Sequence, residues 1–210
     1  METVVSIVEN LKKSLIKEVI DKRMKEFETL GKKDSDELFK ELAFCLMTAN
    51  FNAKKSIQIQ EEIRDGFFTL PEKQLVKKLA ELGHRFPNMR GKYICESRKC
   101  RRNLKKTLKS FKSEIEAREW LVKNIKGLGM KEASHFLRNI GYKNVAIIDF
   151  HIVDLLVREK LIEQPKSKSL THKKYVEIEN ILRKIAEKTK TSLGELDLYL
   201  WYKETGTVLK

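Results

Sequence analysis

Apolar residues recur along this chain at intervals of three and four positions, the spacing of one face of an α-helix. In the first segment they form a single predicted stripe, made of Val4, Val8, Leu11, Leu15, Val19 and Ile20. Similar runs follow through most of the chain, and only 9 glycines and 3 prolines interrupt them. The pattern therefore predicts an all-α protein of about ten helices.

Residues that start and stop helices divide this pattern. The predicted N-caps, each followed three residues later by a glutamate, are Asp34, Ser113 and Ser192. Glycines predicted to end helices are Gly66, Gly83 and Gly141. The run Asn50-Phe51-Asn52 predicts a short break between two helices. The apolar run from Val145 to Ile148 is too short to decide between a buried turn and a strand.

The composition of the chain is typical of a globular protein. It has 210 residues, 41% of them hydrophobic, and a mean hydropathy of −0.46, which argues against disorder. No run of 18 apolar residues suggests a membrane span, and Glu2 and Glu9 interrupt the N-terminal apolar stretch, so no signal peptide is expected. Three cysteines predict a reduced, intracellular protein without disulfides.

Charge adds the first functional indication. Lysine and arginine total 44 against 30 acidic residues, a net charge of +14. Such an excess favours binding to a polyanion, most commonly nucleic acid. A basic protein without that specialisation stays open as the alternative.

Two glycines lie between two predicted helices at Gly127-Leu-Gly129. Glycine permits a tight turn and leaves amide groups uncovered at the positive end of the next helix, a place that suits a phosphate. A plain helix–helix turn is the alternative. Ala133 downstream and the net charge favour a helix-hairpin-helix, a clamp for the DNA backbone in which Gly127 and Gly129 would contact phosphate.

Lys131 and Asp149 are the candidate chemical groups. Lys131 follows the hairpin, where it could contact phosphate or act as a nucleophile, since an uncharged amine can attack an electrophilic carbon. Asp149 ends an apolar run and could be an N-cap, or could orient an amine and stabilise positive charge on a sugar. His151, two residues on, is more often structural than catalytic.

These residues together resemble the helix-hairpin-helix DNA glycosylase superfamily, and most of all its archaeal and bacterial type-2 8-oxoguanine DNA glycosylase/AP lyase (Ogg) family. The resemblance covers essentially the whole chain. Besides Gly127 to Lys131, Asp149 and His151, the segments that carry it are Leu46-Met-Thr-Ala-Asn-Phe51, Leu82-Gly-His-Arg-Phe86, Lys131-Glu-Ala-Ser-His-Phe-Leu-Arg-Asn139, Leu196-Asp-Leu-Tyr-Leu-Trp-Tyr202 and Thr205-Gly-Thr-Val-Leu-Lys210. Met130 and Phe150 depart from the commonest sequences of this branch without removing a functional group.

The resemblance implies two helical domains with a DNA-binding cleft between them. Residues 31–124 would form a central bundle, and residues 1–30 with 125–210 the hairpin domain. The implied activity is excision of 8-oxoguanine through a lysine Schiff base, followed by β-elimination. The implied partner is double-stranded DNA containing an oxidised base, and no membrane is expected to take part. The protein is expected to be a monomer that acts in a prokaryotic cytoplasm, in association with the nucleoid.

The family's roles transfer to matching positions. In order of function these are the nucleophile Lys131, the catalytic Asp149, the residue that fills the vacated stack Asn50, the base-sandwiching Phe86 and Trp201, and the lesion-recognising Lys210. Arg85 and Arg90 flank Phe86 and are read as DNA contacts or as solvated surface. The remaining large aromatics on helical faces are predicted to be core: Phe39, Phe44, Trp120, Phe136 and Tyr175.

No cofactor is expected for this chemistry. The histidines do not cluster with cysteines as a zinc site requires, and an iron–sulfur cluster would need four C-terminal cysteines, whereas the last one is Cys100. The family's hairpin often holds a monovalent cation on backbone carbonyls. Two alternatives stay open: the same chemistry on another oxidised base, and a non-catalytic DNA-binding module.

Overall fold

The computed structural model describes residues 1–167 and 169–210, and in this part of the chain it confirms an all-α fold, with thirteen α-helices, one 3₁₀ helix and no β-strand. The helices of the first half are α1 (Glu2–Lys12), α2 (Ile16–Lys32), α3 (Ser35–Thr48), α4 (Ala53–Ile63), α5 (Gly66–Thr69), α6 (Glu72–Glu81), α7 (Pro87–Ser97), the 3₁₀ helix η1 (Arg98–Asn103) and α8 (Leu104–Lys109). Those of the second half are α9 (Glu114–Asn124), α10 (Met130–Asn139), α11 (Phe150–Arg158), α12 (His172–Thr189) and α13 (Leu193–Thr205).

The predicted N-caps are confirmed. Asp34 accepts the amides of Asp36 and Glu37, and Ser113 and Ser192 each accept the amide three residues on. Each cap satisfies a backbone donor that the helix itself leaves unpaired.

The first predicted stripe is wrong at Leu15 and Val19, whereas its last member, Ile20, is buried as predicted. The chain turns at residues 13–15 instead of continuing one helix, and the Ser14 hydroxyl donates to the Leu11 carbonyl at 2.8 Å. The turn changes the phase of the helix, so Leu15 is 84% exposed and Val19 is 49% exposed. In α2 the buried face instead carries Ile20 and Phe27.

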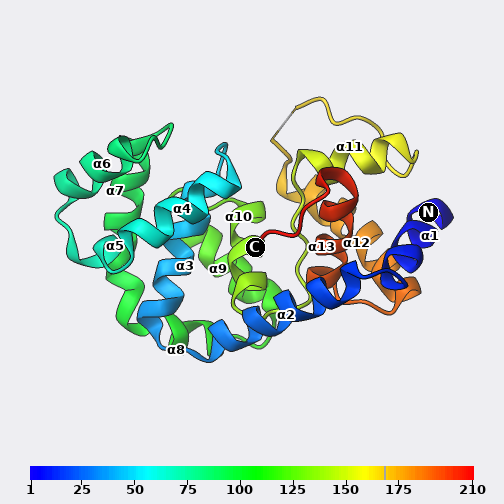
Figure 1. Cartoon of the computed structure of the whole chain (residues 1–210), viewed down its shortest axis with the longest axis horizontal. Coiled ribbons are helices and arrows are strands. Elements are labelled where there is room, and N and C mark those ends of the chain that lie inside the picture. The colour runs from blue at the N-terminus through cyan, green and yellow to red at the C-terminus, as the bar shows by residue number, and fades with distance from the viewer. Residues whose placement is uncertain (168) are drawn as a thin grey trace.

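Two groups of helices stand side by side (Figure 1). Helices α3 to α9 form one half, α1 and α11 to α13 form the other, α10 lies at the centre and α2 runs along both. Each half has its own apolar cluster. The first includes Leu42, Phe67, Leu121 and Phe136, and the second includes Val8, Ile152, Ile178 and Leu196.

Helix α2 passes very close to the end of α10. A Cβ atom added at Gly31 would lie 2.0 Å from the carbonyl oxygen of Ile140, so only glycine allows this approach. The close packing ties the helix that follows the hairpin to the helix that spans both halves.

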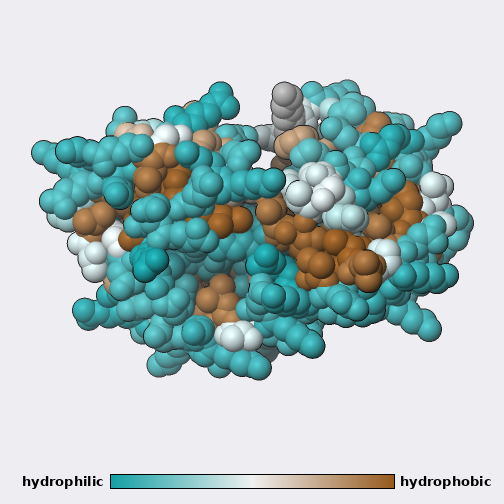
Figure 2. Space-filling view, in the orientation of Figure 1, coloured by the Kyte–Doolittle hydropathy of each residue, from teal (hydrophilic) through white to brown (hydrophobic). Residues whose placement is uncertain are grey.

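The apolar run from Val145 to Ile148 is buried and forms neither helix nor strand; it leads directly into α11. The outer surface in Figure 2 is mostly hydrophilic, with apolar side chains gathered mainly along the middle and over the right-hand half. None of the described helices is long and apolar enough to cross a bilayer.

Candidate active site

A glycine-containing hairpin joins α9 to α10. Gly127 has a φ of +92°, and a Cβ at this position would lie 2.3 Å from the Tyr93 ring, so the hairpin docks against α7 only with glycine there. Gly129 is the N-cap of α10, and no side chain caps this helix. Its first amide groups therefore remain available to an anion. This arrangement of two helices around a glycine turn is a helix-hairpin-helix.

Lys131 is the second residue of α10 and is half-buried. Within the described residues its amine has no hydrogen-bond or ion-pair partner. Burial is the largest effect on three groups near it, raising the pKa of Cys45 and Asp197 and lowering that of His135, and the positive charge of Lys131 favours a lower pKa at all three. Lys131 therefore lies near the junction of α3, α10 and α13, which carry these three buried groups.

Asp149 is the N-cap of α11. Its Oδ1 accepts the amide of Ile152 at 3.0 Å, so the N-cap role left open by the sequence is confirmed. Capping also fixes the carboxylate at the positive end of a helix, because it is tied to the first turn. The cap and a chemical role are compatible, since a carboxylate has further acceptor positions.

Asp197, on α13, links the two candidate groups. It is buried, and its carboxylate accepts a hydrogen bond from Arg138 at 2.5 Å. Burial raises the pKa of Asp197 to about 6, Arg138 opposes that shift, Asp149 adds to it and Lys131 reduces it. Lys131 and Asp149, from different helices, are thus both near enough to Asp197 for their charges to influence it.

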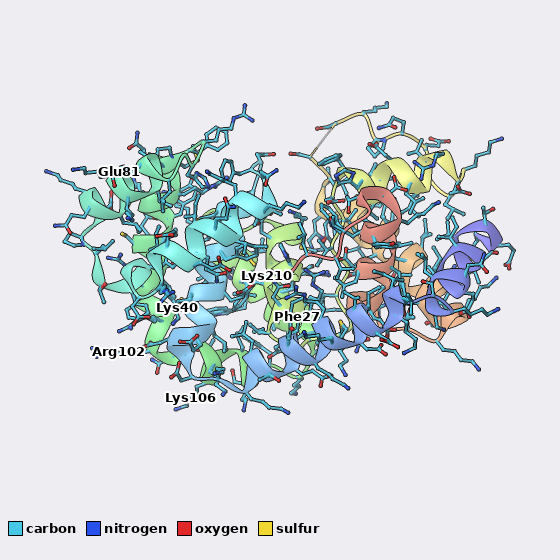
Figure 3. All side chains as sticks on the ribbon, in the orientation of Figure 1. Phe27, Lys40, Glu81, Arg102, Lys106 and Lys210 are labelled. Atoms are coloured by element: carbon cyan, nitrogen blue, oxygen red, sulfur yellow. The ribbon has the colours of Figure 1, made fainter. Side chains whose placement is uncertain are left out.

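Lys210 reaches across to the first half of the molecule, and Figure 3 shows it in the middle, away from Arg102 and Lys106 at the outer edge. Its amine lies 2.9 Å from Glu41, donates to Gln60 and stands 4.2 Å from the centroid of the Phe44 ring. Glu41 also accepts from Asn139 of α10 at 2.6 Å. This polar group joins α3, α4, α10 and residue 210.

His135 lies one turn beyond Lys131 on α10 and is buried. Its ring packs edge-on against Phe44, with centroids 5.7 Å apart. Burial, reinforced by Arg138 and Lys131, holds the pKa of His135 well below its usual value, so the ring is neutral at pH 7. Its Nδ1 has no hydrogen-bond partner among the described residues.

Asn50 stands at the exposed turn between α3 and α4 with a φ of +57°, a conformation that asparagine tolerates better than most residues. Two buried side chains hold the end of α3 in front of it. His84 bonds to the Met47 carbonyl at 3.1 Å, and Arg90 donates to the Ala49 carbonyl at 2.7 Å.

Arg90 corrects a prediction. It was expected at the surface, either on DNA or in solvent, but only 5% of it is exposed because the guanidinium is drawn inward to the Ala49 carbonyl. Its role is to hold the turn that presents Asn50. Arg85 is exposed and lies 5.0 Å from the centroid of the Phe86 ring.

Phe86 belongs to the same group as Asn50. Its amide donates to His84 Nδ1 at 3.0 Å, so the other ring nitrogen of His84 carries the proton and donates to Met47. Burial lowers the pKa of His84, which keeps that neutral form. The two turns that carry Asn50 and Phe86 are therefore fixed to each other.

Trp201 belongs to the other half, on α13. The ring of His151 lies between Phe150 and Trp201, with centroid distances of 3.9 and 5.0 Å. The indole nitrogen is buried without a hydrogen-bond partner among the described residues. Among the described residues no aromatic contact joins Phe86 to Trp201, which belong to separate halves.

The sequence reading missed several polar residues at this junction: Glu41, Gln60, His135, Arg138 and Asp197. The available signal was a charge inside an apolar helical run, as in Leu196-Asp-Leu198. Among the residues that the structure describes, no group of three histidine, cysteine, aspartate or glutamate side chains could hold a metal ion.

Residues 20–191 match the helix-hairpin-helix family described as 8-oxoguanine DNA glycosylase. The chain is 54% identical over 210 residues to the 8-oxoguanine DNA glycosylase/AP lyase of Korarchaeum cryptofilum, covering 100% of this chain and 99% of that one. The chain therefore belongs to this family of 8-oxoguanine DNA glycosylases.

Solved structures of two relatives are similar to this chain over essentially its whole length. The Methanocaldococcus jannaschii 8-oxoguanine glycosylase/lyase, crystallised with a 15mer DNA containing 8-oxoguanine, is similar with a TM-score of 0.96 and 52% identity, over 99% of this chain and 100% of that one. The 8-oxoguanine DNA glycosylase of Thermotoga maritima gives a TM-score of 0.92 and 43% identity, over 100% and 99% of the two chains.

We predict that Arg90→Gln lowers the free energy of unfolding by about 1–3 kcal/mol, because the Ala49 carbonyl loses a charged, buried donor. Arg85→Gln removes an exposed arginine and should change the free energy of unfolding by less than about 0.5 kcal/mol. Urea denaturation of both variants measures the difference. Equal stability of the two variants would contradict the buried, structural role of Arg90.

Proposed function

We propose that this protein excises 8-oxoguanine from double-stranded DNA and then cleaves the strand at the abasic site, with Lys131 as the nucleophile. The observation that carries the proposal is a half-buried lysine on the first turn after the hairpin, whose amine is unpaired among the described residues. A passive DNA-binding module needs neither this amine nor Asp149. The names of the relatives support the same substrate.

Binding begins with the backbone of DNA. The uncapped start of α10 and the net charge of +14 provide amides and cations for phosphates. Each neutralised phosphate releases counterions, so affinity should fall steeply as salt rises. Arg85 is exposed beside Phe86 and is a candidate for one of these contacts.

The target atom is buried in the base stack, so the damaged nucleotide must leave the duplex, at a cost of a few kcal/mol. Asn50 at its exposed turn would fill the vacated position. Phe86 and Trp201, presented by the two halves, would hold the base, since stacking on aromatic rings contributes about 1–3 kcal/mol per base.

The chemistry follows from the paired groups. The amine of Lys131, reacting as the free base, forms a bond to C1′ of the sugar, the C1′–N9 bond breaks, and the base leaves as an anion that takes up a proton from water. Asp149 stabilises the positive charge that develops on the sugar and takes a proton from the amine. The sugar ring opens to a Schiff base on Lys131. Loss of a C2′ proton then expels the 3′ phosphate.

Lys210 is the proposed reader of the lesion. Its amine is held by Glu41 and Gln60 and lies over Phe44, at the same junction to which Lys131 contributes charge. A fixed cation with spare donors suits the oxygen that distinguishes 8-oxoguanine from guanine.

Other features complete the proposal. We infer that residues 31–124 and residues 1–30 with 125–210 act as the two domains that enclose DNA, as a monomer. The hairpin carbonyls would hold a monovalent cation, and no other cofactor is needed for the steps above. The relatives are archaeal and bacterial, and the proposed place of action is the prokaryotic nucleoid.

Lys131→Gln should abolish strand cleavage and borohydride trapping of a protein–DNA adduct on an 8-oxoguanine duplex, because glutamine cannot form a Schiff base. Lys126→Gln, an exposed lysine of the same hairpin, should retain both. Gel electrophoresis after borohydride treatment is the measurement, and an adduct in the Lys131 variant would disprove the assignment.

Asp149→Asn should lower the single-turnover rate by about 100-fold or more, because the negative charge is removed from the reacting sugar. Asparagine caps helices as well as aspartate does, so α11 should persist. Rapid-quench kinetics give the rate, and fluorescence anisotropy should show unchanged binding of the lesion duplex. A matching loss of binding would mean that Asp149 acts only in the structure.

Lys210→Met should slow excision of 8-oxoguanine by about tenfold or more, as expected for the loss of a charged hydrogen bond. Cleavage at a preformed abasic site should stay near the wild-type rate, because no base is left to recognise. Lys203→Met, an exposed lysine of α13, is the control. Equal losses on both substrates would remove Lys210 from recognition.

A further inference from the structure

The four residues before Asp149 are buried and form neither helix nor strand, and no strand among the described residues pairs with them. Their backbone N–H and C=O groups must find other partners, because a buried polar group without a hydrogen bond is costly. This segment also determines where Asp149 lies, since α11 begins at its end.

Two side chains of α12 supply partners for three of these backbone groups. The Tyr175 hydroxyl donates to the Ala146 carbonyl at 2.7 Å and accepts the amide of Ile148 at 3.2 Å. Glu179 accepts the amide of Ala146 at 2.7 Å. Tyr175 and Glu179 are one helical turn apart on α12, so both side chains stand on the same face of that helix.

A buried ion pair fixes Glu179 in turn. Arg118 of α9 donates to both of its carboxylate oxygens, at 2.6 and 2.8 Å, and the two side chains are almost entirely buried. Burial alone would lower the pKa of Arg118, but the bonds and charge of Glu179 outweigh it and the pKa is raised. The guanidinium therefore stays charged.

The same guanidinium reaches the helix that carries Lys131. Arg118 donates to the Ser134 hydroxyl at 3.2 Å, and Ser134 stands three residues after Lys131 on α10. The Tyr175 and Ser134 hydroxyls are also within 3.5 Å of each other. One buried set of hydrogen bonds thus connects the backbone ahead of Asp149 to the first turns of α10.

We propose that Tyr175, acting beside the Arg118–Glu179 pair, is a positioning residue that sets the Asp149 carboxylate against the Lys131 amine. This inference rests on the proposed function. Tyr175 is buried and does not enter the chemical steps; it acts through the peptide groups of Ala146 and Ile148. Small displacements of a reacting group are enough to slow a reaction, and about 1 Å can cost 100-fold.

The test is Tyr175→Phe, which keeps the ring and removes only the hydroxyl. The single-turnover rate on an 8-oxoguanine duplex should fall by about 10- to 100-fold. The dissociation constant for that duplex, measured in a Lys131→Gln background, should be unchanged. Tyr199→Phe is the matched control: this tyrosine is also fully buried, but its hydroxyl has no partner among the described residues.

A kinetic double-mutant cycle separates positioning from general damage. If Tyr175 acts through Asp149, Tyr175→Phe should cause no further loss of rate in the Asp149→Asn background. The full loss in both backgrounds, or a rate equal to that of Tyr199→Phe, would overturn the inference. So would a loss of binding as large as the loss of rate.

Ser134→Ala decides the matter if Tyr175→Phe does not fold. It removes the hydroxyl through which Arg118 and Tyr175 reach α10, and it should slow excision without weakening binding; an unchanged rate would overturn the inference. Failure of the proposed function itself would look different, because the wild-type protein would then neither excise the base nor form a trapped adduct.

Discussion

Arg118 and Glu179 form a bidentate ion pair in the apolar interior, between the first helix of the hairpin and α12. Such a pair seldom stabilises a fold more than packed apolar side chains would, but it cannot be broken on one side without leaving a buried charge. Glu179 also accepts the amide of Ala146, so the pair fixes the segment that leads to Asp149. The placement of one catalytic candidate against the other depends on this constraint.

A second polar group joins the two halves on the side of α3. Glu41 collects Lys210, Gln60 and Asn139, while Arg138 pairs with Asp197 on α13. Each member is buried or nearly so, and each satisfies another across an element boundary. Electrostatic interactions are stronger in such surroundings than in water. The proposed chemistry would therefore take place where the charges of Lys131, Asp149 and Asp197 lie close enough to influence one another.

Local signals made much of the fold predictable. Caps such as Asp34 and Ser113 act over three residues, so the sequence alone predicts them, and Lys131 and Asp149 follow from the resemblance. Contacts between residues distant along the chain could not be predicted in this way, as the inward turn of Arg90 to Ala49 shows. The predicted stripe also breaks before Leu15 and Val19, at a turn that contains no glycine or proline. Tyr175 was expected only to fill the core, because spacing reports that a side chain is buried and not which backbone group its hydroxyl meets.

The most direct test of the account is the location of the covalent bond. The wild-type protein would be trapped with borohydride on an 8-oxoguanine duplex, digested, and analysed by tandem mass spectrometry. The account predicts a single modified residue, Lys131, carrying the reduced sugar remnant. A remnant on any other lysine, or on the N-terminal amine, would contradict it.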